Sequence, residues 1–296
     1  MSLLSRLSWL LAAALLLAGC GVTAPTVAPS PSGSPTATLA VASDGTADSA
    51  LLAEIVTQAL VAKGRPAAVT TLPTADALAA VTAGSVAVLP AFARGLLAGV
   101  SGSEAQLSVE AMVQQLATDL EDEAGVIQAS GIDAGGRYVV TEAFATKHKL
   151  TSLTELGSVE ELRLVGPGAA SALSDGPSGL LAVYGVKATW SPQDDPALRI
   201  SALESDTADV AYLSRIDLAG AALNLVTLED PLGVLQPDPQ VLLITPALRD
   251  DLDVLEVLQA VQTLLTDENF AALRVQAGNA GVGPAVHGFL ATNGLA

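Results

Sequence analysis

The sequence predicts an α/β fold in which helices cover a mostly parallel sheet. From Thr38 onward, short apolar segments typical of strands alternate with longer amphipathic segments typical of helices. Half of the chain is hydrophobic, so a sizeable core is available. Residues 37–296 suffice for one large domain or for two lobes, since a domain has about 100–200 residues.

The first elements are predicted to form a βαβαβ unit. They are, in chain order, a strand at 38–42, a helix that Asp48 caps and Gly64 ends, a strand at 68–72, a helix at 75–82 capped by Thr74, and a strand at 85–89 that ends at Pro90. In doubly wound folds, ligands bind at the edge where the strands end. We therefore expect a group of residues after the first and third strands to gather near one crevice: Ser43, Asp44, Thr46, Phe92 and Arg94.

A second α/β block follows a helix that Ser108 opens and that runs to Leu120. Its predicted elements are strands at 137–141, 162–165, 209–213 and 223–228, a helix at 177–184, and a short helix with a capping box of Ser152 and Glu155. After a strand at 241–244 the chain is predicted to be helical, with Pro246 in a first turn, Asp267 as a cap, and Gly278 and Gly294 as helix ends. The simplest topology assigns 37–136 and 243–296 to a first lobe and 137–242 to a second.

The N-terminal segment predicts export and lipid anchoring. One basic residue, Arg6, precedes an apolar run from Leu7 to Ala18, and Leu17-Ala18-Gly19-Cys20 then resembles a lipobox. Residues 1–19 are thus a predicted signal peptide, and Cys20 is the predicted lipidated N-terminus of the mature protein. A transmembrane anchor would need about 20 apolar residues, and a buried structural cysteine is unusual at the end of a signal-like segment.

Residues 20–36 read as a tether rich in Pro, Ser and Thr, with too few apolar side chains to offset the entropy of ordering. Together with the diacylglyceryl group expected on Cys20, this places the protein in the cell envelope, attached to the extracytoplasmic face of the cell membrane. No binding chemistry is expected in the tether.

Composition argues against several classes of function. The formal charge is −18 with only 13 Lys and Arg, which disfavours nucleic acid as a partner. The single cysteine excludes a disulfide framework, and His148 and His287 lie too far apart in the sequence to suggest a metal site or a catalytic triad. Since the sequence contains neither a Gly-x-Ser-x-Gly elbow nor a Walker phosphate loop, we expect no enzyme activity, no cofactor and no metal. Charge and composition suggest a monomer.

A series of short motifs resembles the solute-binding proteins of ABC importers for glycine betaine, choline and other osmoprotectants. The motifs are Val41-Ala42-Ser43-Asp44, Leu89-Pro90-Ala91-Phe92, Asp175-Gly176-Pro177-Ser178-Gly179-Leu180, Leu198-Arg199-Ile200-Ser201-Ala202-Leu203, Ala208-Asp209-Val210-Ala211, Leu228-Glu229-Asp230 and Phe289-Leu290-Ala291-Thr292-Asn293-Gly294-Leu295. Each is short, but their order and spacing cover nearly everything from Thr38 onward. The resemblance implies a two-lobed periplasmic-binding-protein fold of the venus-flytrap kind, with two crossing hinge strands near 135–138 and 241–245. It also implies that a small molecule is captured between the lobes and delivered to a permease and ATPase complex.

The resemblance fails where the ligand should bind. Family members hold a quaternary ammonium against aromatic faces, and their motif after the third strand usually reads Tyr-Pro-Glu-Tyr-Thr-Gly, where this chain has Leu89-Pro90-Ala91-Phe92-Ala93-Arg94. Ala170, Leu173 and Asp238-Pro239 replace further expected pocket residues. Phe92 and Tyr212 remain as candidates for an aromatic cage, so a typical betaine cage is not expected.

Two arginines suggest a different ligand. Arg94 in the first lobe and Arg215 in the second would face the cleft, and guanidinium groups pair with carboxylate, sulfonate or phosphate. The alternative is that both are surface arginines. Asp44 can meet a ligand ammonium or cap a turn. The ligand is therefore a quaternary amine or a zwitterionic or anionic solute.

Two hypotheses of function follow. The first is a lipid-anchored solute-binding subunit of an ABC importer. The second is a degenerate two-lobed envelope scaffold or sensor that no longer transports a small ligand. An envelope hydrolase is disfavoured, because the sequence offers no activated nucleophile and no cluster of metal ligands.

Overall fold

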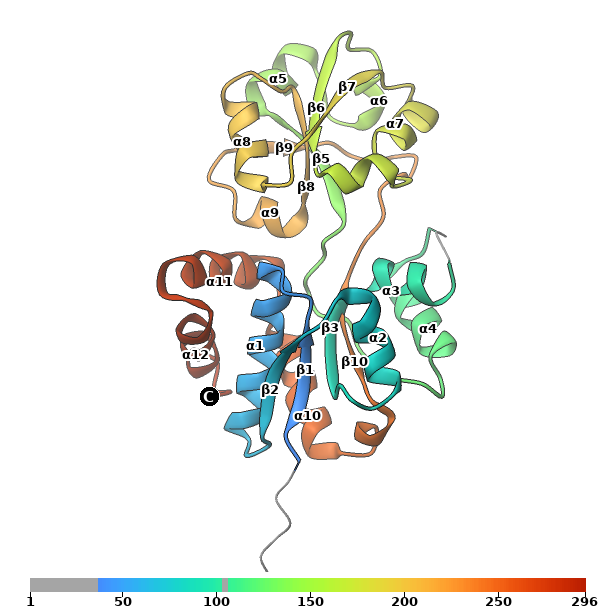
Figure 1. Ribbon diagram of the computed structural model, residues 1–296. Helices are drawn as coiled ribbons and strands as arrows, with labels where there is room; N and C mark the ends of the chain where they lie inside the picture. Colours follow the sequence, from blue (N-terminus) through green and yellow to red (C-terminus); the bar gives the residue numbers. More distant parts are fainter. Residues whose placement is uncertain (1–36, 103–105) are drawn as a thin grey trace, which may run out of the picture. The chain divides into compact units, whose positions relative to one another are not determined.

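The computed structural model describes residues 37–102 and 106–296. Its strands form two sheets of five, in the orders β2-β1-β3-β10-β4 and β7-β6-β8-β5-β9 (Figure 1). We call the parts built on them the first and second lobes. The strands are β1 (Leu39–Ser43), β2 (Ala67–Thr71), β3 (Val88–Phe92), β4 (Gly125–Ile127), β5 (Gly136–Thr141), β6 (Leu162–Gly166), β7 (Ala188–Pro192), β8 (Val210–Ser214), β9 (Leu225–Thr227) and β10 (Gln240–Ile244).

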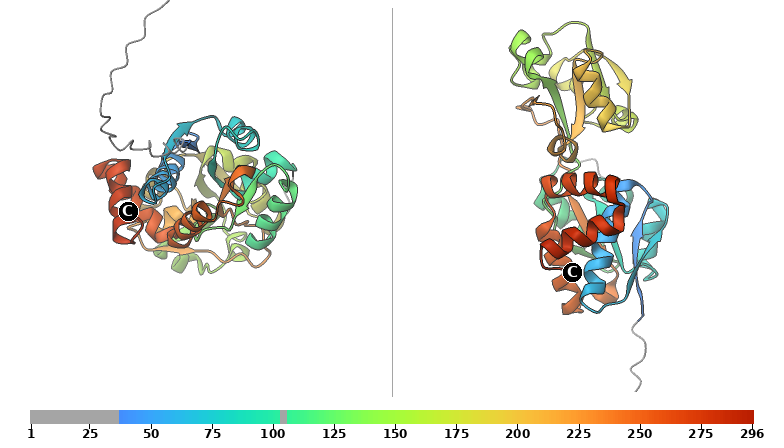
Figure 2. Two further views of the ribbon diagram at one scale, coloured as in Figure 1. Left: turned by 90° about the horizontal axis from the view of Figure 1, so that it is seen from below. Right: turned by 90° about the vertical axis from the view of Figure 1, so that its left-hand side faces the viewer.

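The first lobe confirms the predicted βαβαβ unit. Strand β1 lies parallel to β2 and β3, while β10 lies antiparallel to β3 and β4. The helices of this lobe are α1 (Ala47–Ala62), α2 (Thr74–Thr82), α3 (Ala93–Val100), α4 (Val109–Asp119), η2 (Pro246–Leu248), α10 (Leu252–Leu264), α11 (Asp267–Ala280) and α12 (Val282–Thr292). Helix α12 packs on both α1 and α11 (Figure 2).

Separate hydrophobic clusters occupy the two faces of the first sheet. One combines α1 with α10, α11 and α12 and includes Ile55, Leu258 and Phe270. The other combines α2, α3 and α4 and includes Leu96 and Leu116. Alternate side chains of a strand point to opposite faces, so β10 supplies Leu242 to the first cluster and Leu243 to the second.

The second lobe is also covered by helices on both faces. Strand β6 runs parallel to β7 and β8, and β5 runs antiparallel to β8 and β9. Its helices are α5 (Glu142–His148), α6 (Leu153–Leu156), η1 (Gly168–Ala172), α7 (Pro177–Tyr184), α8 (Pro196–Glu204) and α9 (Arg215–Ala219). The predicted capping box of Ser152 and Glu155 is present at the start of α6, where it satisfies backbone donors that the helix itself leaves free.

Two predicted aspartate caps are wrong. Thr46, not Asp48, caps α1, and Thr266, not Asp267, caps α11. In each case the threonine hydroxyl accepts a hydrogen bond from the backbone N–H three residues later. The aspartate lies inside the first turn, and its carboxylate is engaged elsewhere, as Asp48 is with Arg274.

Other element ends also differ from the prediction. Pro90 lies within β3 rather than ending it, because β3 continues beside β10 after its pairing with β1 has stopped at Val88. Thr74 is the first residue of α2 and makes no capping bond to that helix. Helix α11 passes through Gly278 and ends before Gly281, whose φ of 86° suits glycine.

Several elements were not predicted: α3, β4, β7, α8 and α9. The chain passes from the first sheet to the second between β4 and β5, and it returns between β9 and β10. The predicted boundary at 242/243 lies within β10, and the expected hinge at 241–245 overlaps this strand in all but its last residue; all residues of β10 pair with β3.

Thr36–Ala296 form a compact unit of their own, which contains both sheets. The predicted signal peptide, Cys20 and the tether lie outside the described residues. Within the part that is described, no helix is both long and apolar enough to span a bilayer.

Candidate functional site

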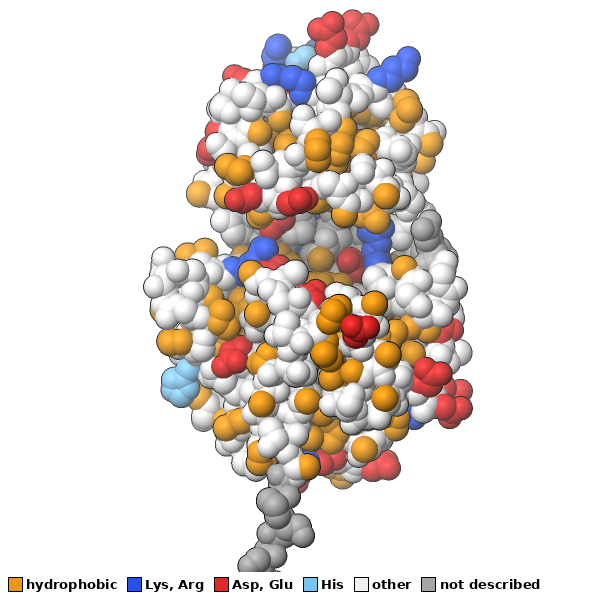
Figure 3. Space-filling model, viewed as in Figure 1, with side chains coloured by type: hydrophobic (Ala, Val, Ile, Leu, Met, Phe, Trp, Pro, Cys, Tyr) orange, Lys and Arg blue, Asp and Glu red, His pale blue; other side chains and the backbone are white. Residues whose placement is uncertain are grey.

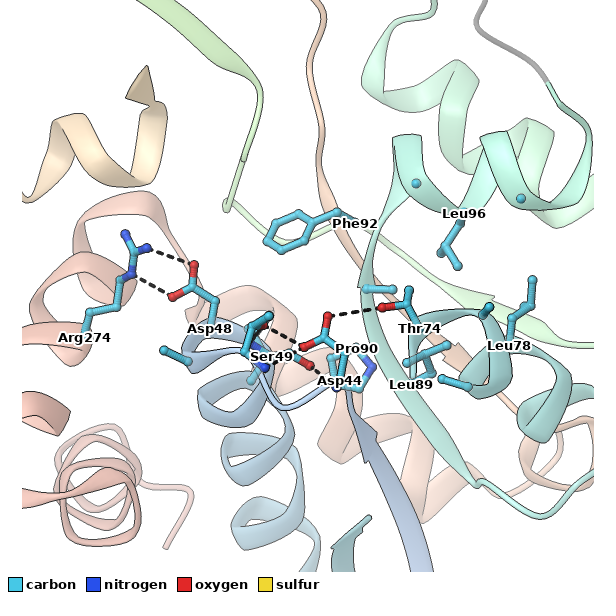
Figure 4. Close-up of a pocket in the computed structure, with 18 residues that line it drawn as sticks. Asp44, Asp48, Ser49, Thr74, Leu78, Leu89, Pro90, Phe92, Leu96 and Arg274 are labelled. Carbon is cyan, nitrogen blue, oxygen red and sulfur yellow. Dashed lines mark hydrogen bonds and ion pairs between the residues drawn. The ribbon is translucent and has the colours of Figure 1, made fainter. Parts of the chain in front are cut away.

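A cavity of about 850 Å³ lies in the first lobe, at the carboxyl ends of β1 and β3. Its walls come from the start of α1, from α2, β3 and α3, and from Arg274 of α11 (Figure 4). Carboxyl ends of neighbouring strands are the usual ligand position in open α/β sheets. The space-filling view shows hydrophobic and acidic side chains together on this lobe (Figure 3).

Asp44 places a carboxylate in the cavity. It follows β1, and its Oδ1 accepts hydrogen bonds from the Thr46 backbone N–H and hydroxyl at 2.9 and 2.7 Å, while Thr74 Oγ1 donates to Oδ2 at 3.3 Å. Burial raises the pKa of Asp44, but the hydrogen bonds from Thr46, Ser49 and Thr74 outweigh it, so the pKa lies below its usual value. The group is therefore negatively charged at neutral pH.

Ser43 supports this turn and does not line the cavity. Its side chain is buried, and its hydroxyl accepts from the Gly45 N–H at 3.1 Å. Gly45 has a φ of 84°, a conformation that residues with a side chain rarely adopt. The turn thus directs Asp44 and Thr46, and not Ser43, toward the cavity.

A second carboxylate, Asp48, lines the cavity as one half of an ion pair. Arg274 donates to it from Nε and Nη2 over 2.7 and 3.0 Å. Arg274 Nη1 also donates to Asp217 of the second lobe at 2.9 Å. Burial raises the pKa of Asp48, Arg274 opposes the rise, and the charges of Asp217 and Asp44 add to it, so the net shift is upward. Among the described residues, the charged groups that line the cavity are Asp44, Asp48 and Arg274, so the net charge of this lining is negative.

Phe92 is the aromatic residue of the cavity wall in the part of the chain that the structure describes. It ends β3, is partly buried against the first hydrophobic cluster, and lies between the Asp48–Arg274 pair and the leucines of α2 and α3 (Figure 4). An aromatic face near a carboxylate attracts a cation that has no hydrogen to donate.

Arg94 does not line this cavity. Its Nη1 and Nη2 donate to Oδ2 and Oδ1 of Asp175 at 2.9 and 3.2 Å, and the Asp175 side chain is fully buried. Burial lowers the pKa of Arg94, but the hydrogen bonds and charge of Asp175 raise it further, so the net shift is upward. Arg94 is therefore not a free guanidinium at this cavity, because it joins the first lobe to the second through Asp175.

Tyr212 and Arg215 are also engaged elsewhere. Tyr212 is buried in the second lobe, where its hydroxyl donates to Asp175 Oδ2 at 3.1 Å and its ring stands edge-on to Tyr138. Burial and the charge of Asp175 raise the pKa of Tyr212. Arg215 pairs with Asp267 at 2.9 Å. The structure therefore assigns neither residue to the cavity of the first lobe.

Of the residues predicted to gather at the strand ends, the cavity contains Asp44, Thr46 and Phe92. Sequence reasoning missed Arg274, which lies 226 residues from Asp48 and has no local motif. It also missed the apolar wall of Leu78, Leu89 and Leu96. Within the described ranges, no cluster of three or more His, Cys, Asp or Glu side chains could hold a metal ion.

Comparison with known families gives one match that covers most of the chain. The OpuAC model, described as the substrate binding domain of ABC-type glycine betaine transport system, matches residues 37–291. No curated protein matches the chain.

Solved structures match over most of their length. Apo YehZ from Escherichia coli has a TM-score of 0.69 and 21% identity, covering 88% of this chain and 99% of that one. A structure described as a glycine betaine/carnitine/choline ABC transporter has a TM-score of 0.73 and 17% identity, with coverage of 87% and 99%. A glycine betaine, L-proline-binding protein from Borrelia burgdorferi has a TM-score of 0.58 and 14% identity, with coverage of 87% and 94%. At these identities the likeness shows the fold, and the predicted two-lobed architecture is confirmed.

Proposed function

The chain belongs to the OpuAC family, the substrate binding domain of ABC-type glycine betaine transport systems, and we propose that it is the extracytoplasmic solute-binding subunit of an ABC importer. It is anchored through Cys20, captures a small amine between its lobes, and delivers it unchanged to a permease and ATPase complex. The lipobox-like segment supports the anchor, and family membership supports delivery.

One observation carries the choice of ligand: Phe92 and Asp44 line the same cavity. A quaternary ammonium offers no hydrogen-bond donor, so an aromatic face and an ionised carboxylate are its natural partners. The anionic alternative loses its support, because Arg94 and Arg215 are paired with Asp175 and Asp267. The proposed ligand is a quaternary amine, either cationic or zwitterionic.

The degenerate scaffold or sensor is a second candidate that a specific observation favours. Three arginines join side chains of the two lobes directly, in the pairs Arg94–Asp175, Arg274–Asp217 and Arg215–Asp267. Such pairs hold lobes together without a solute between them. A protein of this kind would bind none of the amines.

Calorimetric titration of residues 37–296 with choline, glycine betaine, a sulfonate and a small carboxylate separates the two candidates. We expect saturable binding that Asp44→Asn weakens about tenfold, since a charge-assisted contact is worth about 1.5 kcal/mol. Asp76→Asn is the matched control, because Asp76 is an exposed residue of α2 that does not line the cavity.

Other results of the same titration would contradict the proposal. Binding of a sulfonate or a small carboxylate, without binding of either amine, would show that the site prefers an anionic ligand to a cationic one. If none of these compounds binds, the scaffold or sensor is favoured.

A further inference from the structure

We propose that the solute carries an apolar chain attached to its ammonium group, and that this chain lies in a slot between α2 and α3. The inference rests on the proposed function, because it concerns the same cavity. It goes further by stating what the part of the solute remote from the charge must be.

The cavity has two chemically different ends. Its charged end consists of Asp48 and Arg274. Its other end is lined by Leu78 of α2 and Leu96 of α3, with Leu89 of β3 beneath them (Figure 4). The carboxylate of Asp44 and the ring of Phe92 lie between the two ends (Figure 4). A solute whose ammonium occupies the middle can therefore extend its remaining atoms along the leucines.

Two glycines keep the apolar end open. Gly95 and Gly99 both line the cavity, and their spacing in α3 places them on one face of the helix. A Cβ built on either residue would meet no atom of the described residues within 4 Å. Neither has a positive φ, so the backbone does not require glycine there.

These two glycines destabilise helix α3, and no contact in the fold requires glycine at either position. Glycine inside a helix is less stable than alanine because it loses more conformational freedom. At Gly95 and Gly99 no packing contact compensates for this loss. A ligand that lies against the helix backbone does compensate, since any side chain at these positions would occupy the ligand's space.

The size of the cavity agrees with a longer solute. A volume of about 850 Å³ is typical of sites for drug-sized ligands. Choline or glycine betaine would leave much of it unfilled. The unfilled part borders leucines, so apolar atoms are the ones that would gain from occupying it.

The test uses alkyltrimethylammonium ions of increasing length, from tetramethylammonium through butyl to hexyl, titrated calorimetrically into residues 37–296. We expect affinity to rise about fourfold for each methylene that enters the slot, until the slot is full. The heat-capacity change of binding should become more negative along the series. Hexanol, which lacks the charge, should bind far more weakly than the hexyl ammonium.

A matched pair of variants locates the slot. Gly99→Leu should weaken the binding of hexyltrimethylammonium by at least tenfold and change the affinity for tetramethylammonium by less than twofold. Gly288→Leu is the control, because Gly288 is an exposed glycine of α12 with the same free space around its Cβ position and no place in the cavity. It should leave the whole series unchanged.

The outcomes distinguish the two proposals. If tetramethylammonium binds and affinity does not rise with chain length, the slot is wrong and the proposed function stands. Equal effects of Gly99→Leu on short and long ions would also contradict the slot. If no member of the series binds, the proposed function fails, and the slot fails with it.

Discussion

Arg94 of α3 and Asp175, which precedes α7, form a two-pronged ion pair between the lobes, with N···O distances of 2.9 and 3.2 Å. The Asp175 side chain is fully buried, while that of Arg94 is 18% exposed. Tyr212 donates a further hydrogen bond to the same carboxylate. Asp175 is thus a buried charge that depends on a partner from the other lobe.

Arg94→Ala should lower the free energy of unfolding by about 3 kcal/mol, because, of the side chains that the structure describes, it leaves only Tyr212 donating to the buried Asp175 carboxylate. Denaturant titration measures the change. The control is Arg163→Ala, whose arginine is 46% exposed in its pair with Asp209, and which should cost much less, because solvent screens an exposed pair. Equal costs for the two variants would contradict a special role for the buried pair.

Asp238 should make stability depend on pH in the acid range. Burial raises the pKa of Asp238 to about 6, with the nearby Asp133 and Asp175 adding to the rise and Arg94 opposing it. A carboxyl with a raised pKa holds its proton more tightly in the folded state. Its contribution to stability is therefore greatest below a pH of about 4 and is lost as pH rises through about 6.

Asp238→Asn isolates this effect, since the amide oxygen can still accept from the Arg94 backbone N–H that bonds Asp238 at 2.9 Å. The unfolding free energy of the wild type minus that of the variant should fall by about 1–2 kcal/mol between pH 4 and pH 7, after allowance for partial exposure. A difference that stays constant with pH would show that Asp238 has an ordinary pKa.

Phe92→Leu should weaken choline binding by about two- to thirtyfold, because a cation–π contact is worth about 0.5–2 kcal/mol. The leucine retains apolar volume, so the loss of choline affinity measures the contribution of the aromatic ring. Phe289→Leu is the matched control, since Phe289 lies on α12 and packs against the first hydrophobic cluster. Calorimetric titration should find choline affinity unchanged in the control and reduced in Phe92→Leu.

Thr46→Ala should reduce both stability and affinity. Thr46 caps α1 and also donates to the Asp44 carboxylate. Its loss should therefore lower the free energy of unfolding by about 1 kcal/mol and leave the Asp44 carboxylate less firmly held at the ligand. Ser108→Ala removes the comparable cap of α4, away from the cavity. It should cost similar stability without changing choline affinity, and a loss of affinity in Ser108→Ala would contradict the assignment of the site.

Cys20→Ala should move the full chain from the membrane fraction to the soluble fraction, because the lipid attachment site is lost. Immunoblotting of fractionated cells measures the distribution. The soluble variant should bind choline as the wild type does. A variant that stays with the membranes would show that another segment provides the anchor.

Local structure could be predicted well where a signal depends on neighbours in the chain. The caps of Ser108 and Ser152, the α7 bounds and the positions of β1, β2 and β5 follow from periodicity and from side chains that reach only a few residues. The βαβαβ order likewise predicted that Asp44, Thr46 and Phe92 meet at one edge, because parallel strands align their ends.

Tertiary structure alone decided the partners of the charged side chains. Asp48 lies where a helix cap was expected, but Arg274 reaches it from α11, and Arg94 turns from the cavity to Asp175. Strand β3 extends past Pro90 only because β10 lies beside it. The physical reason is range: hydrogen bonds of caps and turns are satisfied within a few residues, whereas a buried carboxylate takes whichever guanidinium the packing of distant elements brings within reach.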